Sequence, residues 1–302
     1  MIERMKKSTV QKLNNKNMAN INRKPDWLKV SAFYGEGYKR VNGLLQKYHL
    51  NTVCQAANCP NRGECFNRGT ATFLILGPVC TRNCRFCDIA PGKPEAVDHT
   101  EPQRLAQMVK ELKLKHVVIT SVTRDDLPDG GANQFAQTVE HLRKVDSKLT
   151  VEILTPDFKN KAQAKEIIID CCPDVFNHNV ETVPRLYPTV RPQANYQRSL
   201  ELLKYIADNS SIITKSGLMV GLGETLEELR QVFEDLTHSH VSILTIGQYL
   251  APSKEHLSVV RYLHPDEFLQ LKEMALKAGI KKVLSAPLVR SSYKADLFSI
   301  VE

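Results

Sequence analysis

From residue 73 onward, short apolar runs alternate with segments in which apolar residues recur at every third or fourth position. The runs have the length and composition of buried strands. They cover residues 73–76, 117–122, 151–154, 175–180, 212–220 and 241–250. The periodic segments between them predict amphipathic helices, one of which has its apolar stripe at Leu105, Met108, Val109 and Leu112. Six strand-then-helix units indicate an α/β protein with a parallel sheet and right-handed crossovers.

Residues typical of helix starts, and further periodic apolar positions, support the prediction of these helices. Thr225 and Glu228 form a capping box before an apolar stripe, and Pro265 stands at the first turn of the last predicted helix. Nearer the N-terminus, apolar residues at positions 41, 44, 45 and 48 predict one amphipathic helix that leads into a cysteine-rich segment.

Polar residues follow the carboxyl end of every predicted strand. They include residues 124–126 after the second strand and Asn179 and Glu181 after the fourth. A barrel builds its catalytic face from the loops at these ends, whereas an open doubly wound sheet concentrates polar residues at one switch point. We therefore expect a partial (β/α)6 TIM-type barrel over residues 73–280.

Six of the eight cysteines fall into two triplets. The triplets are Cys54, Cys59 and Cys65, and then Cys80, Cys84 and Cys87. Each is one ligand short of a closed zinc site, whereas a four-iron cluster held by three thiolates keeps one iron open. A disulfide framework does not suit a chain of 302 residues without a signal peptide, but paired zinc sites remain an alternative. We expect Cys171 and Cys172, beside an isoleucine run, to be small buried residues.

Composition narrows the class of protein. Lys plus Arg number 41 against 33 Asp plus Glu, a net charge of +8 that favours acidic partners or nucleic acid. No apolar stretch reaches the length of a membrane span, and thiolate clusters need a reducing compartment, so we expect a soluble, cytoplasmic protein. Residues 1–24 carry seven basic residues against one acid and predict a disordered basic tail, with an organellar transit peptide as the alternative.

The loop with Cys80, Cys84, Phe86 and Cys87, placed after the first strand, resembles the signature of the radical S-adenosylmethionine (SAM) superfamily. The resemblance implies a four-iron cluster whose free iron binds SAM and whose electron cleaves it to a 5′-deoxyadenosyl radical. The protein then supplies the redox centre and the positioning, and the cofactor supplies the reactivity.

The same resemblance implies a set of SAM contacts. They are Asn179, Glu181, Arg191, Gly217 and Met219, the last two in a glycine-containing motif with Gly221 and Glu224. Within this set Glu181 is expected at the ribose hydroxyls and Arg191 at the methionine carboxylate, and the glycines are expected to let the adenosyl group approach the backbone. A plain strand-to-helix turn is the alternative for the motif, and a surface salt bridge is the alternative for Arg191. We expect His178 to be a packing residue.

A second resemblance is narrower. The segments 50–65, 81–84, 124–126, 129–131 and 290–293 closely resemble the lipoyl synthase family, over roughly residues 24–297. The resemblance implies that Cys54, Cys59, Cys65 and Ser292 bind an auxiliary four-iron cluster that donates sulfur. A serine oxygen is a poor ligand for iron beside softer thiolates, which suits a cluster that is opened and consumed. For Arg290 we hypothesise that it shields the serine or steers the carrier, and for Asp125 and Asp126 a turn pinned by Arg124 remains open.

The function implied is insertion of two sulfur atoms at carbons 6 and 8 of a protein-bound octanoyl-lysine, with catalysis resting on Cys80, Cys84, Cys87 and Ser292. Implied partners are an octanoylated lipoyl-carrier domain of a glycine cleavage H protein or a 2-oxoacid dehydrogenase E2, a ferredoxin- or flavodoxin-type reductant, and an iron–sulfur carrier. We expect no nucleic acid, no membrane and a monomer. The domains predicted are 25–72 for the auxiliary cluster, 73–280 for the barrel and 281–302 for the C-terminal segment. A radical SAM methylthiotransferase and a zinc-containing nucleic-acid-binding protein are the alternatives.

Overall fold

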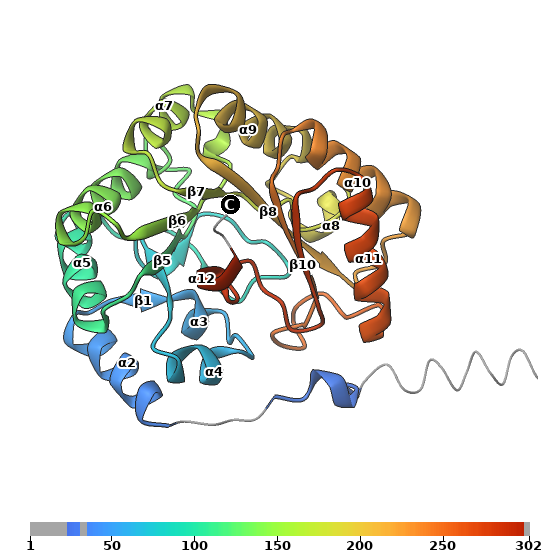
Figure 1. The fold of residues 1–302 in the computed structure, drawn as a ribbon, viewed down its shortest axis with the longest axis horizontal. Helices are drawn as coiled ribbons and strands as arrows, with labels where there is room; N and C mark the ends of the chain where they lie inside the picture. Colours follow the sequence, from blue (N-terminus) through green and yellow to red (C-terminus); the bar gives the residue numbers. More distant parts are fainter. Residues whose placement is uncertain (1–22, 31–34, 299–302) are drawn as a thin grey trace, which may run out of the picture.

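The computed structural model describes residues 23–30 and 35–298, so the predicted disordered tail lies outside the described residues apart from Arg23 and Lys24. Within them one eight-stranded sheet has the order β1–β2–β5–β6–β7–β8–β9–β10. Its strands are β1 (Asn51–Thr52), β2 (Thr72–Ile75), β5 (His116–Ser121), β6 (Thr150–Leu154), β7 (Val175–Asn177), β8 (Ile213–Val220), β9 (Ile243–Gln248) and β10 (Lys282–Ser285). All neighbours pair in parallel except β1 with β2, and the sheet curves into a partial barrel (Figure 1).

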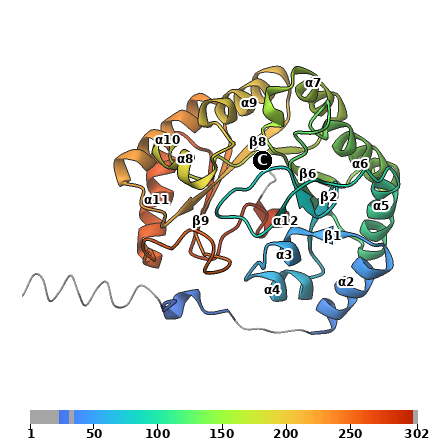
Figure 2. The same cartoon turned by 180° about the vertical axis from the view of Figure 1, so that it is seen from behind.

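Helices cover the outer face of this curved sheet (Figure 1). They are α5 (Glu101–Leu112), α6 (Ala132–Val145), α7 (Ala162–Cys171), α9 (Tyr196–Asn209), α10 (Leu226–His238) and α11 (Pro265–Lys277). Near the open side lie α2 (Glu36–Lys47), α3 (Val53–Ala56) and α4 (Arg62–Asn67), and α8 (Tyr187–Val190) follows β7. The short helix α12 (Ala295–Phe298) lies inside the curve in both views (Figures 1 and 2). A small second sheet pairs β3 (Val79–Cys80) with β4 (Ala90–Pro91).

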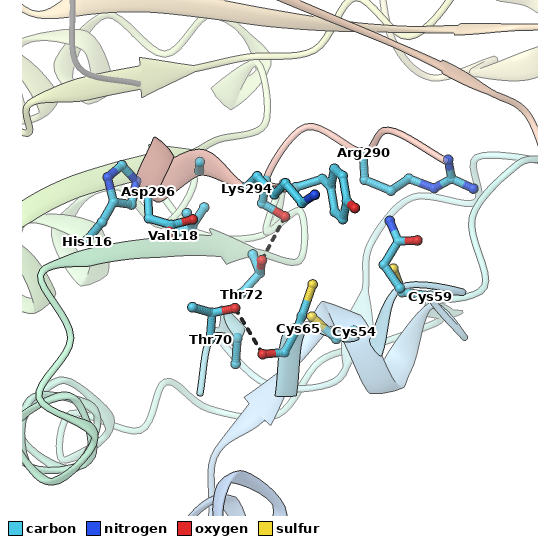
Figure 3. A pocket seen from close by; sticks show the side chains of 15 residues that line it. Cys54, Cys59, Cys65, Thr70, Thr72, His116, Val118, Arg290, Lys294 and Asp296 are labelled. Carbon is cyan, nitrogen blue, oxygen red and sulfur yellow. Dashed lines mark hydrogen bonds between the residues drawn. The ribbon is translucent and has the colours of Figure 1, made fainter. Parts of the chain in front are cut away.

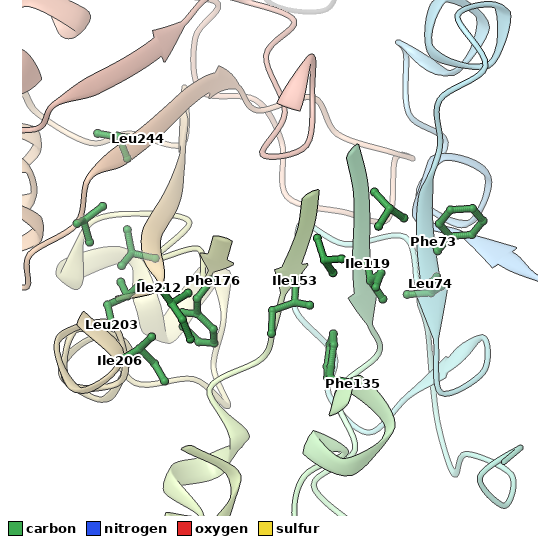
Figure 4. Packing of buried hydrophobic residues seen from close by; sticks show 14 of the residues in the cluster. Phe73, Leu74, Ile119, Phe135, Ile153, Phe176, Leu203, Ile206, Ile212 and Leu244 are labelled. Atoms are coloured by element: carbon green, nitrogen blue, oxygen red, sulfur yellow. The ribbon is translucent and has the colours of Figure 1, made fainter. Parts of the chain in front are cut away.

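The core lies between the sheet and the outer helices, as Figure 4 shows for Phe135 of α6 packed near Ile119 and Ile153. These three side chains are fully buried. A buried Phe or Ile contributes about 1.5–3 kcal/mol relative to an exposed one. Because helices cover one face and the barrel interior the other, the strands read as continuous apolar runs, with β2 and β9 buried along their whole length.

The predicted elements are present. The six predicted strands correspond to β2, β5, β6, β7, β8 and β9, and the helix with the stripe at positions 41–48 is α2. The capping box of Thr225 and Glu228 opens α10, and Pro265 is the first residue of α11. The fold class predicted from the sequence is confirmed.

The sheet contains one parallel strand more than the sequence predicted. The additional strand β10 pairs with β9 from Lys282 to Ser285 and extends the barrel sheet beyond residue 280. This strand has only four residues, and one of them is a lysine. The run is therefore too short and too polar to be predicted as a buried strand. The loop that follows β10 leads into the barrel interior and to α12.

The prediction of a buried Cys171–Cys172 pair is wrong for Cys172. Helix α7 ends at Cys171, and Cys172 caps it in the left-handed conformation with φ 50°. In this position beyond the end of the helix, Cys172 is exposed. Cys171 is half-buried, and burial raises the pKa of its thiol to about 12.

Candidate active site

The two cysteine triplets lie side by side. Cys54 is on α3 and Cys65 on α4, whereas Cys80 ends β3 and begins the loop to Cys87. A direct contact joins the two segments, because the Asn58 amide donates to the Asp88 carboxylate over 2.5 Å. Asn58 precedes Cys59 and Asp88 follows Cys87, so each partner adjoins one triplet.

The first triplet and Ser292 line one pocket (Figure 3). Its wall includes Cys54, Cys59, Cys65, Thr72, Arg290 and Ser292. The hydroxyl of Thr72, at the start of β2, donates to the hydroxyl of Ser292 over 2.7 Å. The structure therefore brings together the four predicted ligands of the auxiliary cluster, although Ser292 follows Cys65 by more than two hundred residues.

The chemistry of this pocket fits a thiolate-bound cluster. All three cysteines are free thiols, and burial together with the neighbouring thiols raises the pKa of Cys54 to about 11 and that of Cys65 to about 12. Thiols that resist ionisation together need a positive centre to become ligands, and cluster iron supplies one. In the part of the chain that the structure describes, no three His, Cys, Asp or Glu side chains converge closely enough to hold a single metal ion.

Arg290 lies between the two sites. Figure 3 shows its side chain extending over the side of the pocket where Cys59 lies. Burial lowers the pKa of its guanidinium, and the negative forms of Cys59 and Glu181 oppose that shift, so its charge is close to both groups. The side chain is half-buried and donates to the Val289 carbonyl over 2.7 Å.

The C-terminal segment is tied to α4 on the far side of the pocket. The Tyr293 hydroxyl lies 3.1 and 3.2 Å from the two oxygens of the Glu64 carboxylate, and Arg68 pairs with Asp296 over 2.8 Å. Because α4 also carries Cys65, these contacts fix Ser292 relative to the cysteines. No local sequence pattern predicts these contacts, because they join residues more than two hundred positions apart.

The loop of the second triplet is anchored by Arg82, which sequence reasoning missed. Arg82 is buried and donates to Asp125 over 2.8 and 2.9 Å and to Asp157 over 2.6 Å. Burial disfavours the ionised Asp157, but the hydrogen bond and charge of Arg82 lower its pKa to about 2. The backbone N–H groups of Arg82 and Thr123 lie 3.4 and 3.3 Å from Cys80 Sγ, which orients that thiol.

Further contacts hold the rest of this loop. Gln193 accepts from the Asn83 N–H over 2.8 Å, the Arg85 N–H donates to the Val190 carbonyl over 3.0 Å, and His256 Nε2 lies 3.1 Å from the Cys87 carbonyl. Burial raises the pKa of the Cys87 thiol to about 12. Protein contacts at Asn83, Arg85 and Cys87 therefore hold the loop in place.

Asp125 and Asp126 have different roles. Arg124 donates to both carboxylate oxygens of Asp126, over 2.8 to 3.2 Å, so the turn pinned by Arg124, which the sequence left open, is present at Asp126. Asp125 points to Arg82 and belongs to the anchor of the cysteine loop.

Glu181 is held in an unusual backbone conformation four residues after β7, where it forms an isolated bridge with Leu218 of β8. Its φ is 67°, and it is fixed there because its N–H donates to the Gly217 carbonyl over 3.0 Å and its carbonyl accepts from Met219 over 2.9 Å. Such left-handed residues cost about 1 kcal/mol or more and cluster at functional sites. The Asn179 amide donates to the Glu181 carboxylate over 3.0 Å, and burial raises the pKa of Glu181.

The glycines of the motif on β8 are required by protein contacts. A Cβ on Gly217 would lie 2.5 Å from Asn179 Oδ1, and a Cβ on Gly221, with φ +99°, would lie 2.2 Å from Gln248 Nε2. Glu224 accepts from the Gly221 N–H over 2.6 Å and so pins the turn that leads to α10. Gly217 thus makes room for Asn179, a predicted SAM contact, whereas Gly221 and Glu224 form a strand-to-helix turn.

The two remaining predicted SAM contacts, Met219 and Arg191, lie near the cysteine loop and near Asn179. Met219 packs on a small apolar cluster that also contacts Phe86 of the cysteine loop. Arg191 is buried, donates to the Asn179 carbonyl over 2.9 Å and lies over the Tyr187 ring at 5.2 Å. The alternative of a surface salt bridge for Arg191 is therefore wrong.

His178 is the packing residue that the sequence predicted. It is buried, with Nδ1 2.8 Å from the Thr155 carbonyl and Nε2 2.9 Å from the Ser199 hydroxyl. A carbonyl can only accept, so Nδ1 carries the proton. Burial, and next the charge of Arg191, lowers the pKa of His178 to about 4, which keeps the ring neutral.

The fold and the cysteine loop define a radical SAM protein, and residues 74–236 match the Radical SAM superfamily. The structure is similar to SuiB of Streptococcus suis, with a TM-score of 0.55, 11% identity, and coverage of 92% of this chain and 60% of that one. It is also similar to methylornithine synthase (PylB), with a TM-score of 0.51, 14% identity, and coverage of 85% of this chain and 87% of that one. At such identities the likeness is one of fold.

Relatives found by sequence identify the family more narrowly than the fold does. A lipoyl synthase of Caldanaerobacter subterraneus subsp. tengcongensis is 54% identical over 276 residues, which is 91% of this chain and 96% of the relative. A lipoyl synthase of Caldicellulosiruptor saccharolyticus is 53% identical over 275 residues, with the same coverage. The chain belongs to the lipoyl synthase family.

Family membership confirms several predictions at once. The predicted family, the radical SAM enzyme class and the sulfur-inserting function are those of these relatives, and neither alternative is favoured. A four-iron cluster and SAM follow from the superfamily. None of the helices in residues 23–30 and 35–298 combines the length and the apolar character needed to traverse a bilayer.

Proposed function

We propose that the protein inserts two sulfur atoms into an octanoyl chain carried on a lysine of a carrier domain, and that it uses two clusters to do so. The observation that carries this proposal is the pocket in which Cys54, Cys59 and Cys65 meet Ser292, beside the separately anchored Cys80–Cys87 loop. A radical SAM enzyme that only generates a radical needs the second of these sites but not the first.

In this proposal Cys80, Cys84 and Cys87 hold the radical cluster, which when bound to SAM supplies the radical that removes hydrogen from an unactivated carbon. The Arg82 anchor fixes the loop, and the amide N–H groups at Cys80 orient one thiolate. Glu181, Asn179, Arg191 and Met219 form the wall against which SAM binds. The Glu181 carboxyl, to which the Asn179 amide donates, suits contact with ribose hydroxyls, because hydroxyls both donate and accept.

Cys54, Cys59, Cys65 and Ser292 hold the auxiliary cluster, which is consumed as the sulfur source. Serine is the exchangeable member of this set, since its oxygen competes poorly with thiolates for iron. Thr72 donates to the Ser292 oxygen, which uses one lone pair and lowers its basicity further. Ser292 is thus suited to leave the cluster when sulfur is withdrawn.

The stoichiometry is balanced over two insertions. Each insertion breaks one carbon–hydrogen bond, whose hydrogen atom leaves in 5′-deoxyadenosine, and forms one carbon–sulfur bond to a sulfide of the auxiliary cluster. Joining the carbon radical to sulfide releases one electron, which iron of that cluster would accept. Each SAM takes one electron from a reductant, for which we propose a ferredoxin- or flavodoxin-type protein. The inserted sulfurs take up protons to give a dithiol.

Family membership implies an octanoylated carrier protein as the substrate, and we propose the H protein of glycine cleavage or the E2 of a 2-oxoacid dehydrogenase. An iron–sulfur carrier is needed to rebuild the consumed cluster. The net charge of +8 favours acidic partners through long-range attraction.

A labelling experiment tests the proposal. Protein whose clusters are built with ³⁴S-sulfide is given an octanoyl-lysine peptide, SAM and dithionite, and the product is analysed by mass spectrometry. The expected product carries two ³⁴S atoms and is absent with Cys54→Ala. That variant should still produce 5′-deoxyadenosine, because its radical site is intact. Unlabelled sulfur in the product, or product formation by Cys54→Ala, would reject the auxiliary cluster as donor.

A further inference from the structure

A short stretch of the C-terminal segment runs from the auxiliary-cluster pocket to the wall of the proposed SAM site. Residues 289–292, called here the bridging segment, lie against β9, where a Cβ on Gly247 would come within 2.0 Å of the Val289 carbonyl. At one end Ser292 accepts from Thr72 in the auxiliary pocket. One residue earlier, the Ser291 hydroxyl accepts from the Asn179 amide over 3.3 Å.

Asn179 is shared between the bridging segment and the SAM wall. Its amide nitrogen donates both to Ser291 and, over 3.0 Å, to the Glu181 carboxylate. Its carbonyl oxygen Oδ1 is buried and makes no hydrogen bond within the described residues. A buried acceptor without a donor is unfavourable, so this oxygen is ready to accept from a ligand. Gly217 leaves the space that the amide occupies.

We propose that the Asn179–Ser291 hydrogen bond couples SAM binding to the ligation of the auxiliary cluster by Ser292. This inference rests on the proposed function, in which Ser292 is a cluster ligand and Asn179 a SAM contact. Ser291 is a positioning residue in this scheme, because it reaches the cluster only through its neighbour.

The direction of the coupling follows from the orientation of the amide. A donor on SAM that binds Asn179 Oδ1 holds the amide in the orientation in which its nitrogen donates to Ser291. Consecutive Cα atoms are about 3.8 Å apart across a planar peptide, so holding Ser291 also restricts Ser292. Bound SAM therefore favours Ser292 on the cluster, and by reciprocity a cluster held by Ser292 strengthens SAM binding.

The size of the effect is that of one neutral hydrogen bond. A contribution of this kind changes an equilibrium constant about threefold to tenfold. Arg290 lies in the same segment and is unchanged in every variant compared below.

A thermodynamic cycle tests the coupling. The dissociation constant of SAM is measured by equilibrium dialysis on protein with both clusters and on Cys54→Ala, which lacks the auxiliary cluster, and both are repeated with Ser291→Ala. We expect SAM to bind about threefold to tenfold more tightly when the auxiliary cluster is present, and this ratio to approach one with Ser291→Ala. Ser291→Thr keeps the hydroxyl and should restore the ratio.

Ser285→Ala is the matched control, because the Ser285 hydroxyl on β10 donates to the Phe268 carbonyl, away from both sites. It should leave the ratio unchanged. An unchanged ratio with Ser291→Ala, or equal SAM affinities with and without the auxiliary cluster in the parent protein, would overturn the coupling. Iron content of each sample separates this from failure of the proposed function, in which the parent protein would carry one cluster only.

Discussion

The hydroxyl of Thr72 donates a 2.7 Å hydrogen bond to the hydroxyl of Ser292, and so joins the first barrel strand to the C-terminal segment. This contact fixes the one oxygen among the four proposed ligands of the auxiliary cluster. The Thr72 side chain is buried, so water cannot replace its hydroxyl as the donor. The stability of the cluster should therefore depend on a residue that is not itself a ligand.

Thr72→Val keeps the shape of the side chain but removes this donor. A neutral hydrogen bond contributes about 1 kcal/mol, so we expect the auxiliary cluster to lose iron to a chelator about fivefold faster, while the radical cluster is unaffected. The measurement is the time course of iron release followed by absorbance. Thr138→Val, on α6, is the control, because the Thr138 hydroxyl donates to the Gln134 carbonyl of the same helix. Equal release rates in the two variants would contradict the role of Thr72.

Arg82→Met should be severely destabilising. It leaves Asp125 without its partner and removes one of the two arginines that pair with the buried Asp157, the other being Arg198 at 2.9 Å. Breaking a buried ion pair costs up to about 3–5 kcal/mol. Arg185→Met, which breaks an exposed pair with Glu228, should cost less than about 1 kcal/mol. Urea unfolding of the cluster-free proteins gives both values. If the two variants lost similar free energies of unfolding, the anchoring role of Arg82 would be wrong.

Gly217→Ala should weaken SAM binding without unfolding the barrel. The added methyl group would lie 2.5 Å from Asn179 Oδ1 and would displace that amide from the wall of the site. Overpacking of this kind costs about 1–3 kcal/mol, so we expect the dissociation constant of SAM to rise about tenfold or more. Gly43→Ala, on α2 with no atom within 4 Å of the new Cβ, should bind SAM normally and gain up to about 1 kcal/mol of stability. Unaltered SAM affinity in Gly217→Ala would count against Asn179 as a contact.

His178 predicts a dependence of stability on pH. Its pKa is about 4 in the folded protein and near 6.5 when unfolded, so the unfolded chain binds the extra proton between these values. Stability is therefore complete above pH 6.5 and falls as the pH drops towards 4, by about 2 kcal/mol between pH 6.5 and 5. Urea unfolding of cluster-free protein at pH 7.5 and pH 5 measures the loss. His178→Gln should abolish most of it, whereas His238→Gln, at an exposed position, should not.

The sequence predicted the barrel well because its signals are local. Buried parallel strands appear as apolar runs, and Thr225, Glu228 and Pro265 mark helix starts through contacts within a few residues. Strand β10 was missed because four residues with a lysine do not form such a run. Cys172 was misjudged because the end of α7, and not its neighbours in sequence, decides its exposure.

The site was predictable only in part. Cysteine spacing indicates clusters because ligands of one metal group lie close in sequence, and Ser292 followed from a resemblance. Arg82, Thr72 and Ser291 act through partners that are 43 to 220 residues away, so their roles are visible only once the strands are placed side by side.

The most direct test of the account is the iron and acid-labile sulfide content of protein purified without oxygen, compared with Cys54→Ala and Cys80→Ala. We predict about eight irons and eight sulfides per chain, falling to about four in each variant, because the two cysteine sets bind separate four-iron clusters. About four irons in the parent protein, or zinc in place of iron, would contradict the two-cluster account.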